Sequence, residues 1–273
     1  MASQLTARAA GPHSERGVSV TNGLTKYLLT ASGLLAVCIA WQISTTVLPI
    51  FDRRILPPPT TVAATLIDML ASGELLRDAQ ASFMRVAIGS TIAVVLGISI
   101  GIATGASAIV SRVITPIIDF IRPISPIAWI PLAILWFGLG NGPAYFVIFL
   151  AAFFPVITSA HKGVAGISID HLRAADMCGF HGWQRVTRIL LPAALPDVMV
   201  GVKVGIGIAW MAVIAAEFVA AQTGLGYLIE VSRQLFNTPK VLAGMVTVGV
   251  IGYFISVALD RAEQLITPWN RRS

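Results

Sequence analysis

Three ionisable side chains lie inside long apolar stretches, and they are the first candidates for chemistry because burying a charge in lipid is costly. Glu217 stands in an apolar run at residues 196–221, and Lys203 stands fourteen residues before it in the same run. That separation is about four helical turns, too far for a direct pair along one helix. Arg122 follows Asp119 by three residues in another apolar stretch, so Asp119 could neutralise it.

Each of these side chains has more than one possible role. Glu217 could line a polar route across the membrane, cap nearby backbone groups or hold an outer gate shut. A carboxylate repels an anion, so direct binding of an anionic substrate is the less favoured role. Arg122 and Lys203 could instead snorkel to the cytoplasmic interface.

A proline-rich segment follows Arg122. Pro123, Pro126 and Pro131 lie within nine residues and free backbone groups, which is tolerated at membrane depth only where they are buried in protein or line a cavity. The side chains predicted to face a translocation pathway are Arg122, Ser125, Trp129, Trp136, Trp210 and Glu217. The alternative for the tryptophans is a position at the lipid headgroup boundary.

The polar loop between the fourth and fifth apolar stretches has the pattern of a docking element. A short helix begins near Ser168 or Asp170, both good N-caps, and Gly179 then permits a sharp turn. Trp183–Leu191 is predicted to form a second amphipathic helix that ends at Pro192. An inert connection is the alternative. A DNA-binding helix-turn-helix is disfavoured because basic residues are few and the loop is tethered between two spans.

Composition places these features in a membrane. Of 273 residues, 56% are hydrophobic and 12% are charged, against roughly 45–50% and about 25% in soluble domains. The mean hydropathy is +0.80, so we expect an integral membrane protein. The net charge of +6 then reflects basic cytoplasmic loops rather than a nucleic-acid partner. His161, His171 and His181 lack a partner set for a metal site, so no bound metal is expected.

The apolar pattern predicts an all-α membrane protein with about six transmembrane helices. The predicted spans are residues 27–48, 86–106, 113–137, 145–160, 196–221 and 241–259. Between the first two spans, residues 52–85 are predicted to be amphipathic, with a short surface helix at 62–70. Small residues recur every four positions at Gly97, Gly101 and Gly105 and again at Gly201, Gly205 and Ala209, which predicts close helix packing.

Six spans put both termini on one side of the membrane. Eleven basic residues fall on that side and six on the other, so the positive-inside rule places the termini in the cytoplasm. The predicted organisation is a cytoplasmic segment at 1–26, a transmembrane domain at 27–260 with a cytoplasmic loop at about 161–195, and a cytoplasmic tail at 261–273.

The loop resembles the coupling loop of the permease subunits of bacterial ABC importers. The matching residues are Arg173-Ala174-Ala175, Gly179 and Ile189-Leu190-Leu191-Pro192, with Arg173 standing where the family pattern has Glu. Further segments resemble the nitrate/sulfonate/taurine/bicarbonate branch. These are Ile55–Pro59, Arg122–Pro131, Leu135–Gly140, Ala215–Glu217 with Gly224–Gly226, and Leu265–Trp269, so the resemblance covers roughly residues 55–270.

The resemblance implies a type I ABC importer permease fold in the bacterial inner membrane. It implies three partners besides the lipid bilayer: a cytoplasmic ATPase dimer, an extracytoplasmic substrate-binding protein and a second permease copy. The coupling loop, through Arg173, Ala174, Ala175, Gly179, Leu191 and Pro192, would dock onto the ATPase. The chain has no Gly-x-x-x-x-Gly-Lys-[Ser/Thr] motif, so it is not expected to be an enzyme, and ATP and its Mg²⁺ belong to the partner.

The substrate stays open among taurine, other alkanesulfonates, nitrate, cyanate and bicarbonate. A secondary transporter would need an ionisable relay and discontinuous helices in two related halves, whereas only one predicted span is broken. An intramembrane enzyme would need a metal cluster or a Ser/His or Asp pair at membrane depth. A non-transporting membrane scaffold would not require a docking loop.

Overall fold

A computed structural model describes residues 23–47 and 55–268, and its regular elements in these ranges are all helices. In chain order they are α1 (Gly23–Thr46), α2 (Pro59–Ala71), α3 (Glu74–Ala106), α4 (Ala108–Ile121), the 3₁₀ turn η1 (Pro126–Trp129), α5 (Ile130–Phe137), α6 (Asn141–Ala165), α7 (Ile169–Met177), α8 (Gly182–Arg185), the π turn η2 (Val186–Leu190), α9 (Leu191–Ala220), α10 (Leu225–Gln234) and α11 (Thr238–Ile266).

Four of these helices are long and apolar enough to cross a membrane. They are α3, α6, α11 and the continuous run Gly182–Ala220 that contains α9. The pair α4 and η1–α5 adds a fifth if the two halves form one span. The remaining predicted span, 27–48, coincides with α1 as far as the described residues reach. Residues 1–22, which make up most of the predicted N-terminal segment, and residues 269–273 of the predicted tail lie outside the described residues.

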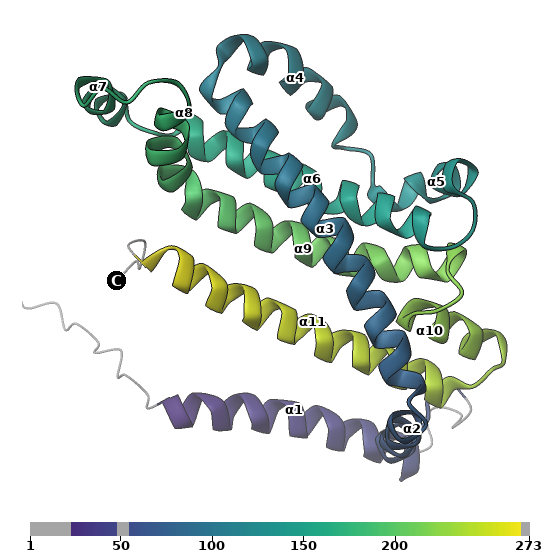
Figure 1. The fold of residues 1–273 in the computed structure, drawn as a ribbon. Coiled ribbons are helices and arrows are strands. Elements are labelled where there is room, and N and C mark those ends of the chain that lie inside the picture. The colour runs from purple at the N-terminus through teal and green to yellow at the C-terminus, as the bar shows by residue number, and fades with distance from the viewer. Residues whose placement is uncertain (1–22, 48–54, 269–273) are drawn as a thin grey trace, which may run out of the picture.

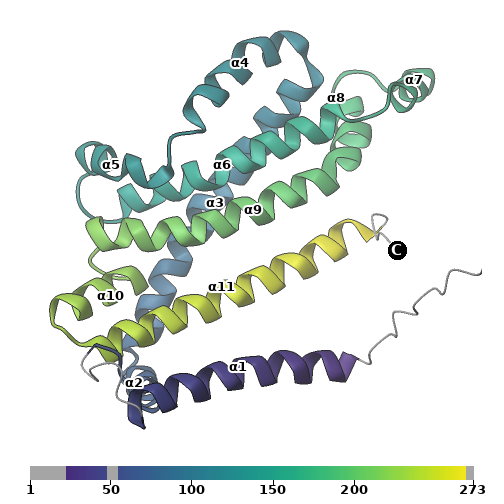
Figure 2. The same ribbon diagram turned by 180° about the vertical axis from the view of Figure 1, so that it is seen from behind.

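The helices lie side by side and share two ends (Figures 1 and 2). At one end, α7 and α8 lie with the C-terminal end of α11 and the start of α1. At the other end lie α2, α5 and α10. The described chain therefore begins and ends on the same side as the loop that connects α6 to α9.

The helix α3 corrects the predicted start of the second span. It begins at Glu74, twelve residues before the predicted residue 86, directly after Gly73 in the left-handed conformation at φ +74°. The predicted surface helix at 62–70 is confirmed as α2, but residues 74–85 continue into the span. The prediction was wrong because Asp78, Ser82 and Arg85 read as polar surface, whereas all three are buried.

The predicted break in the third span is a sharp bend. Between α4 and η1–α5 the chain turns by 84° over residues 122–125. A proline removes a backbone N–H and restricts the residue before it, so Pro123 and Pro126 stop α4 from continuing. The 3₁₀ turn η1 then starts with Pro126, where a missing N–H costs nothing.

Glycines let α6 pack tightly between α3 and α9. A Cβ built on Gly101 would lie 2.5 Å from the Cβ of Ala160, and one on Gly97 would lie 2.9 Å from Val156 Cγ1. On the other side of α6, a Cβ on Gly201 would lie 2.5 Å from the Cβ of Ser159. No real Cβ tolerates such distances, so the predicted close packing along both glycine repeats is confirmed.

We expect Gly101→Ala to destabilise the protein by about 1–3 kcal/mol, because the added methyl forces α3 away from the backbone of α6. Gly249→Ala on α11 is the matched control, since nothing lies within 4 Å of a Cβ there. The measurement is the apparent Tm of the purified protein in detergent. Equal Tm values for the two variants would contradict the packing argument.

Candidate coupling and translocation sites

The loop between α6 and α9 forms a compact helical knob at one end of the molecule (Figure 1). Ser168 caps α7 by accepting a hydrogen bond from the backbone N–H of His171 at 3.4 Å. Arg185 of α8 donates to Asp176 of α7 at 3.1 Å, which ties the two short helices together. The predicted helix, turn and second helix are therefore present, with Ser168 as the cap.

Gly179 makes the turn by ending α7 in a Schellman motif. Its φ is +76°, and its N–H donates to Asp176 O at 3.1 Å. The next N–H, of Phe180, donates to Ala175 O at 3.1 Å. These two bonds satisfy carbonyls at the helix end and require a left-handed residue between them, which favours glycine. Nothing lies within 4 Å of a Cβ at this position, so the requirement is one of backbone conformation rather than space.

The knob presents apolar side chains outward. Met177 is 90% exposed and Trp183 is 77% exposed. Arg173 and Ala174 are also exposed, with Arg173 3.7 Å from Asp170, whereas Ala175 is buried. Large exposed apolar side chains at the tip of a polar loop mark an interaction surface.

The second helix of the loop does not end at Pro192, which corrects the sequence prediction. Residues Gly182–Ala220 form one continuous run of 39 residues. In the π turn η2 the N–H of Leu191 donates to Val186 O, five residues back. This wider turn removes the clash that the ring of Pro192 would make with the carbonyl of residue 188. Leu191 and Pro192 are thus the first residues of α9 rather than the end of the loop.

The residues around the bend lie beside cavities. Arg122 and Ser125 are exposed in the single chain, and Arg122 lines one cavity of about 360 Å³ and a neighbouring one of about 200 Å³. Within the described chain no ion pair within 4.0 Å joins Arg122 to Asp119, so the direct pair that their spacing suggested is not formed. Both residues instead line the smaller cavity.

Three tryptophans predicted for the pathway have different surroundings. Trp129 and Trp136 pack edge-on against Phe146 of α6, at centroid distances of 6.2 and 5.6 Å. Trp210 is buried and donates through its indole N–H to Val248 O of α11 at 3.1 Å. Trp210 therefore fastens α11 to α9 within one chain. The pathway role of all three stays a prediction.

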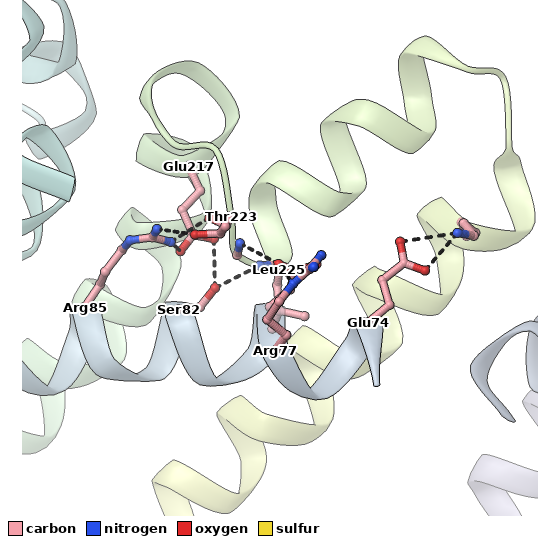
Figure 3. Close-up of polar contacts among 10 residues, drawn as sticks. Glu74, Arg77, Ser82, Arg85, Glu217, Thr223 and Leu225 are labelled. Carbon is pink, nitrogen blue, oxygen red and sulfur yellow. Dashed lines mark hydrogen bonds and ion pairs between the residues drawn. The ribbon is translucent and has the colours of Figure 1, made fainter. Parts of the chain in front are cut away.

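Glu217 is fully buried and paired with Arg85 of α3 (Figure 3). The Arg85 Nη1 to Glu217 Oε1 distance is 2.6 Å. Arg85 also donates to Asn141 Oδ1 at 2.8 Å and to the carbonyl and hydroxyl of Thr223 at 2.7 and 2.8 Å. Four of the five guanidinium N–H groups and both carboxylate oxygens therefore have partners, which offsets the cost of burying the two charges.

The same group caps the start of α10. The backbone N–H of Gly226 donates to Glu217 Oε2 at 2.9 Å, and Ser82 donates to the same oxygen at 2.8 Å. Ser82 in turn accepts from the N–H of Leu225 at 2.9 Å (Figure 3). Glu217 thus caps local backbone groups, one of the roles considered from the sequence, while its place in the pathway stays a prediction. Arg85 was missed because residues up to 85 were read as surface.

Lys203 also has partners on another helix. Its ammonium lies 2.5 Å from Asp260 and 2.7 Å from Glu263, both on α11. The sequence shows these carboxylates but not that α11 runs beside α9. Lys203 is therefore neutralised within the protein.

The three histidines considered for a metal site each form a hydrogen bond with a different group. His161 Nδ1 lies 3.1 Å from Thr104 Oγ1, His171 bonds Ser168, and His181 bonds Gly179 O. Among the residues that the structure describes, no three His, Cys, Asp or Glu side chains form a group that could hold a metal.

Comparison with known proteins assigns a family to this geometry. Residues 93–272 match the family described as binding-protein-dependent transport system inner membrane component. The taurine transport system permease protein TauC of Escherichia coli is 33% identical over 254 residues, covering 90% of this chain and 92% of TauC. The chain belongs to this family of ABC transporter permeases.

Two further likenesses agree with that assignment. The bicarbonate transport system permease protein CmpB of Synechococcus elongatus is 30% identical over 276 residues, covering 95% of this chain and 98% of CmpB. The structure of the inward-facing MetNI methionine ABC transporter contains a chain with a TM-score of 0.64 and 19% identity, covering 72% of this chain and 98% of that one. The permease thus has the type I ABC importer fold and is a multi-pass inner-membrane protein. Its family match includes the knob and α9 to α11, whereas Arg85 lies before it.

We expect Arg85→Met to destabilise this permease by about 3–5 kcal/mol, because it leaves the Glu217 carboxylate buried without its counter-ion. The double variant Arg85→Met/Glu217→Gln should recover part of the loss, since the amide oxygen still accepts from Ser82 and Gly226 without a charge. Arg77→Gln, at an exposed site on the same helix, is the control. Apparent Tm in detergent is the readout, and a double variant no more stable than Arg85→Met would contradict the argument.

Proposed function

We propose that this permease docks a cytoplasmic ATPase dimer on the knob formed by α7 and α8 and imports a small anion. The observation that carries the proposal is the turn at Gly179, which presents Met177 and Trp183 outward on a helix pair joined without a break to α9. ATP and Mg²⁺ would bind to the partner, and this chain would supply no catalytic group. The matched family is named for dependence on a binding protein, which supports a substrate-binding protein at the α10 end.

The continuous helix gives docking a mechanical consequence. Thirty-nine helical residues extend about 58 Å, from α8 at the knob to Glu217 near the opposite end. A displacement of the knob by the ATPase would therefore move the outer half of α9 and the α10 cap that Glu217 holds. Such a helix biases two arrangements of the permease, one for each state of the ATPase.

Two observations support the rest of the assembly. Exposed apolar residues recur along α9 at Val200, Val204, Ile208 and Met211, a stripe that suits packing against a second permease copy. The named relatives transport taurine and bicarbonate, so the substrate we propose is a small sulfonate or oxyanion.

The docking assignment predicts that Gly179→Val uncouples ATP hydrolysis from uptake, because a β-branched residue strongly disfavours φ of +76°. Gly179→Asn is the matched variant, since asparagine tolerates the left-handed conformation and the site has space for it. We expect Gly179→Val to lose at least tenfold of ATP-dependent uptake and Gly179→Asn to keep most of it.

The same experiment includes a gentle detergent pull-down of the tagged permease. A nucleotide-binding subunit should co-purify with the wild-type chain and Gly179→Asn, and less with Gly179→Val. Normal uptake and co-purification in Gly179→Val would contradict the docking assignment, and absence of any ATPase from an intact wild-type complex would contradict the importer.

The native cysteine in the knob tests orientation. Cys178 is free and exposed, and the proposed topology places it in the cytoplasm. In a Cys38→Ser background, an impermeant maleimide should label Cys178 in inside-out vesicles and not in intact spheroplasts. A Phe236→Cys variant that also carries Cys178→Ser is the control, since residue 236 is exposed between α10 and α11 and should label from outside. Labelling of Cys178 in spheroplasts would overturn the topology.

A further inference from the structure

Two neighbouring cavities lie beside the bend after α4, the larger between that bend, α6 and α9 and the smaller between α3, α4 and α6. The larger is about 360 Å³ and is lined by Val204 and Ile208 of α9, and the smaller is about 200 Å³ and is lined by Asp119 of α4. Arg122, Thr158 and Lys162 line both cavities. Lys162 stands in the last turn of α6, at the end from which the knob extends. The two cavities therefore share one basic wall near the proposed cytoplasmic side.

Neither cation of this wall forms an ion pair within the described chain. No carboxylate lies within 4.0 Å of Arg122 or Lys162 there, although Lys203 and Arg85, on α9 and α3, both have ion-pair partners. Asp119 faces the smaller cavity and offsets one positive charge. Two cations and one carboxylate among the lining residues leave a net charge of +1.

The hydroxyls of Thr104 and Thr158 and the imidazole of His161 add little to the donors of these cavities, whereas the Ser159 hydroxyl, which makes no hydrogen bond within the described chain, stays available in the larger one. Thr104 and Thr158 donate to the carbonyls of Gly101 and Phe154 in their own helices. Since the Thr104 proton is used in this way, neutral His161 donates from Nδ1 to Thr104 Oγ1 at 3.1 Å. The strongest donors left for a ligand are therefore the guanidinium of Arg122 and the ammonium of Lys162.

We propose that this basic wall binds the transported anion on its way to the cytoplasm, an inference that rests on the proposed function. A guanidinium presents parallel N–H groups that match the oxygens of a sulfonate or carboxylate, and an ammonium supplies a second, adaptable positive charge. A net charge of +1 suits a singly charged oxyanion better than a doubly charged one. Asp119 weakens the hold on the anion, which favours release.

A lipid phosphate offers the same chemistry as a small oxyanion, so the experiment separates the two. Thr158→Cys in a Cys38→Ser/Cys178→Ser background places one thiol in both cavities. The complex with its ATPase is exposed to the anionic reagent sulfonatoethyl methanethiosulfonate and to its cationic trimethylammonium counterpart. Both reagents transfer a thioalkyl group to the introduced thiolate and release methanesulfinate, so only their charge differs.

We expect the anionic reagent to react faster than the cationic one, and each of Arg122→Gln and Lys162→Gln to lower this rate ratio by about three- to tenfold. Arg112→Gln is the control, since Arg112 is an exposed cation of α4 that lines neither cavity. Methanesulfonate should slow the reaction more than sulfate at equal ionic strength. Equal rates for the two reagents, or no effect of either neutralisation, would overturn the proposal. If Arg122→Gln fails to fold, Lys162→Gln at the exposed end of α6 still decides it.

The second arm compares nanodiscs containing phosphatidylglycerol with lipid-free detergent. Protection by methanesulfonate in both supports a site for the transported anion. Protection in detergent alone assigns the wall to a lipid headgroup and overturns the proposal. Labelling does not depend on transport, so a failed uptake assay with intact protection would contradict the proposed function and leave the anion site standing.

Discussion

Close contact of α6 with both α3 and α9 is the constraint on which the rest of the fold depends. Lipid surrounds the protein with apolar groups, so burying leucine against leucine gains little, and helices associate through close packing and interhelical hydrogen bonds. The glycines of α3 and α9 meet alanines, a serine and valines of α6 at distances that no Cβ would allow. The three helices therefore form a close-packed centre, around which α4, α5, α10 and α11 are arranged.

Polar contacts then fix the peripheral helices to that centre at three levels. At the end where α2 and α10 lie, Lys240 of α11 donates to Glu74 of α3 at 2.9 Å (Figure 3). Farther along α3, Arg85 meets Glu217 and holds the start of α10. Near the opposite end, Lys203 joins α9 to the carboxylates of Asp260 and Glu263. Each contact is specific in register, because an unmatched charge within the membrane would be costly, and together they specify where α10 and α11 lie.

The sequence predicts what depends on local pattern. Hydropathy located the helices, and glycine spacing located the packing faces. The turn at Gly179 followed from residue type alone. The predictions that were wrong concern residues whose surroundings are set by segments distant in the chain or by side-chain placement. Residues 74–85 look like a surface segment until α9 and α10 supply partners for Asp78, Ser82 and Arg85, and Asp119 looks like the partner of Arg122 until the side chains are placed. The predicted helix end at Pro192 was wrong for a different reason. A π turn lets a helix continue past a proline, and the hydrophobic pattern of the sequence does not indicate a π turn.

Glu217 links α9 to both α3 and α10, so it bears on how these helices could move. Glu217 lies close to the end of the same continuous helix that begins at the knob, and its two oxygens bind α3 through Arg85 and Ser82 and α10 through the N–H of Gly226. A Cβ on Gly224 would lie 2.5 Å from Glu217 Oε1, so the segment before α10 has no room to shift independently of this carboxylate. Any displacement of α9 along its axis must therefore carry the α10 cap with it or break a buried ion pair. Because breaking that pair is costly, the end of α9 and the start of α10 are held together as one unit, and the proposed push at the knob would have to move both.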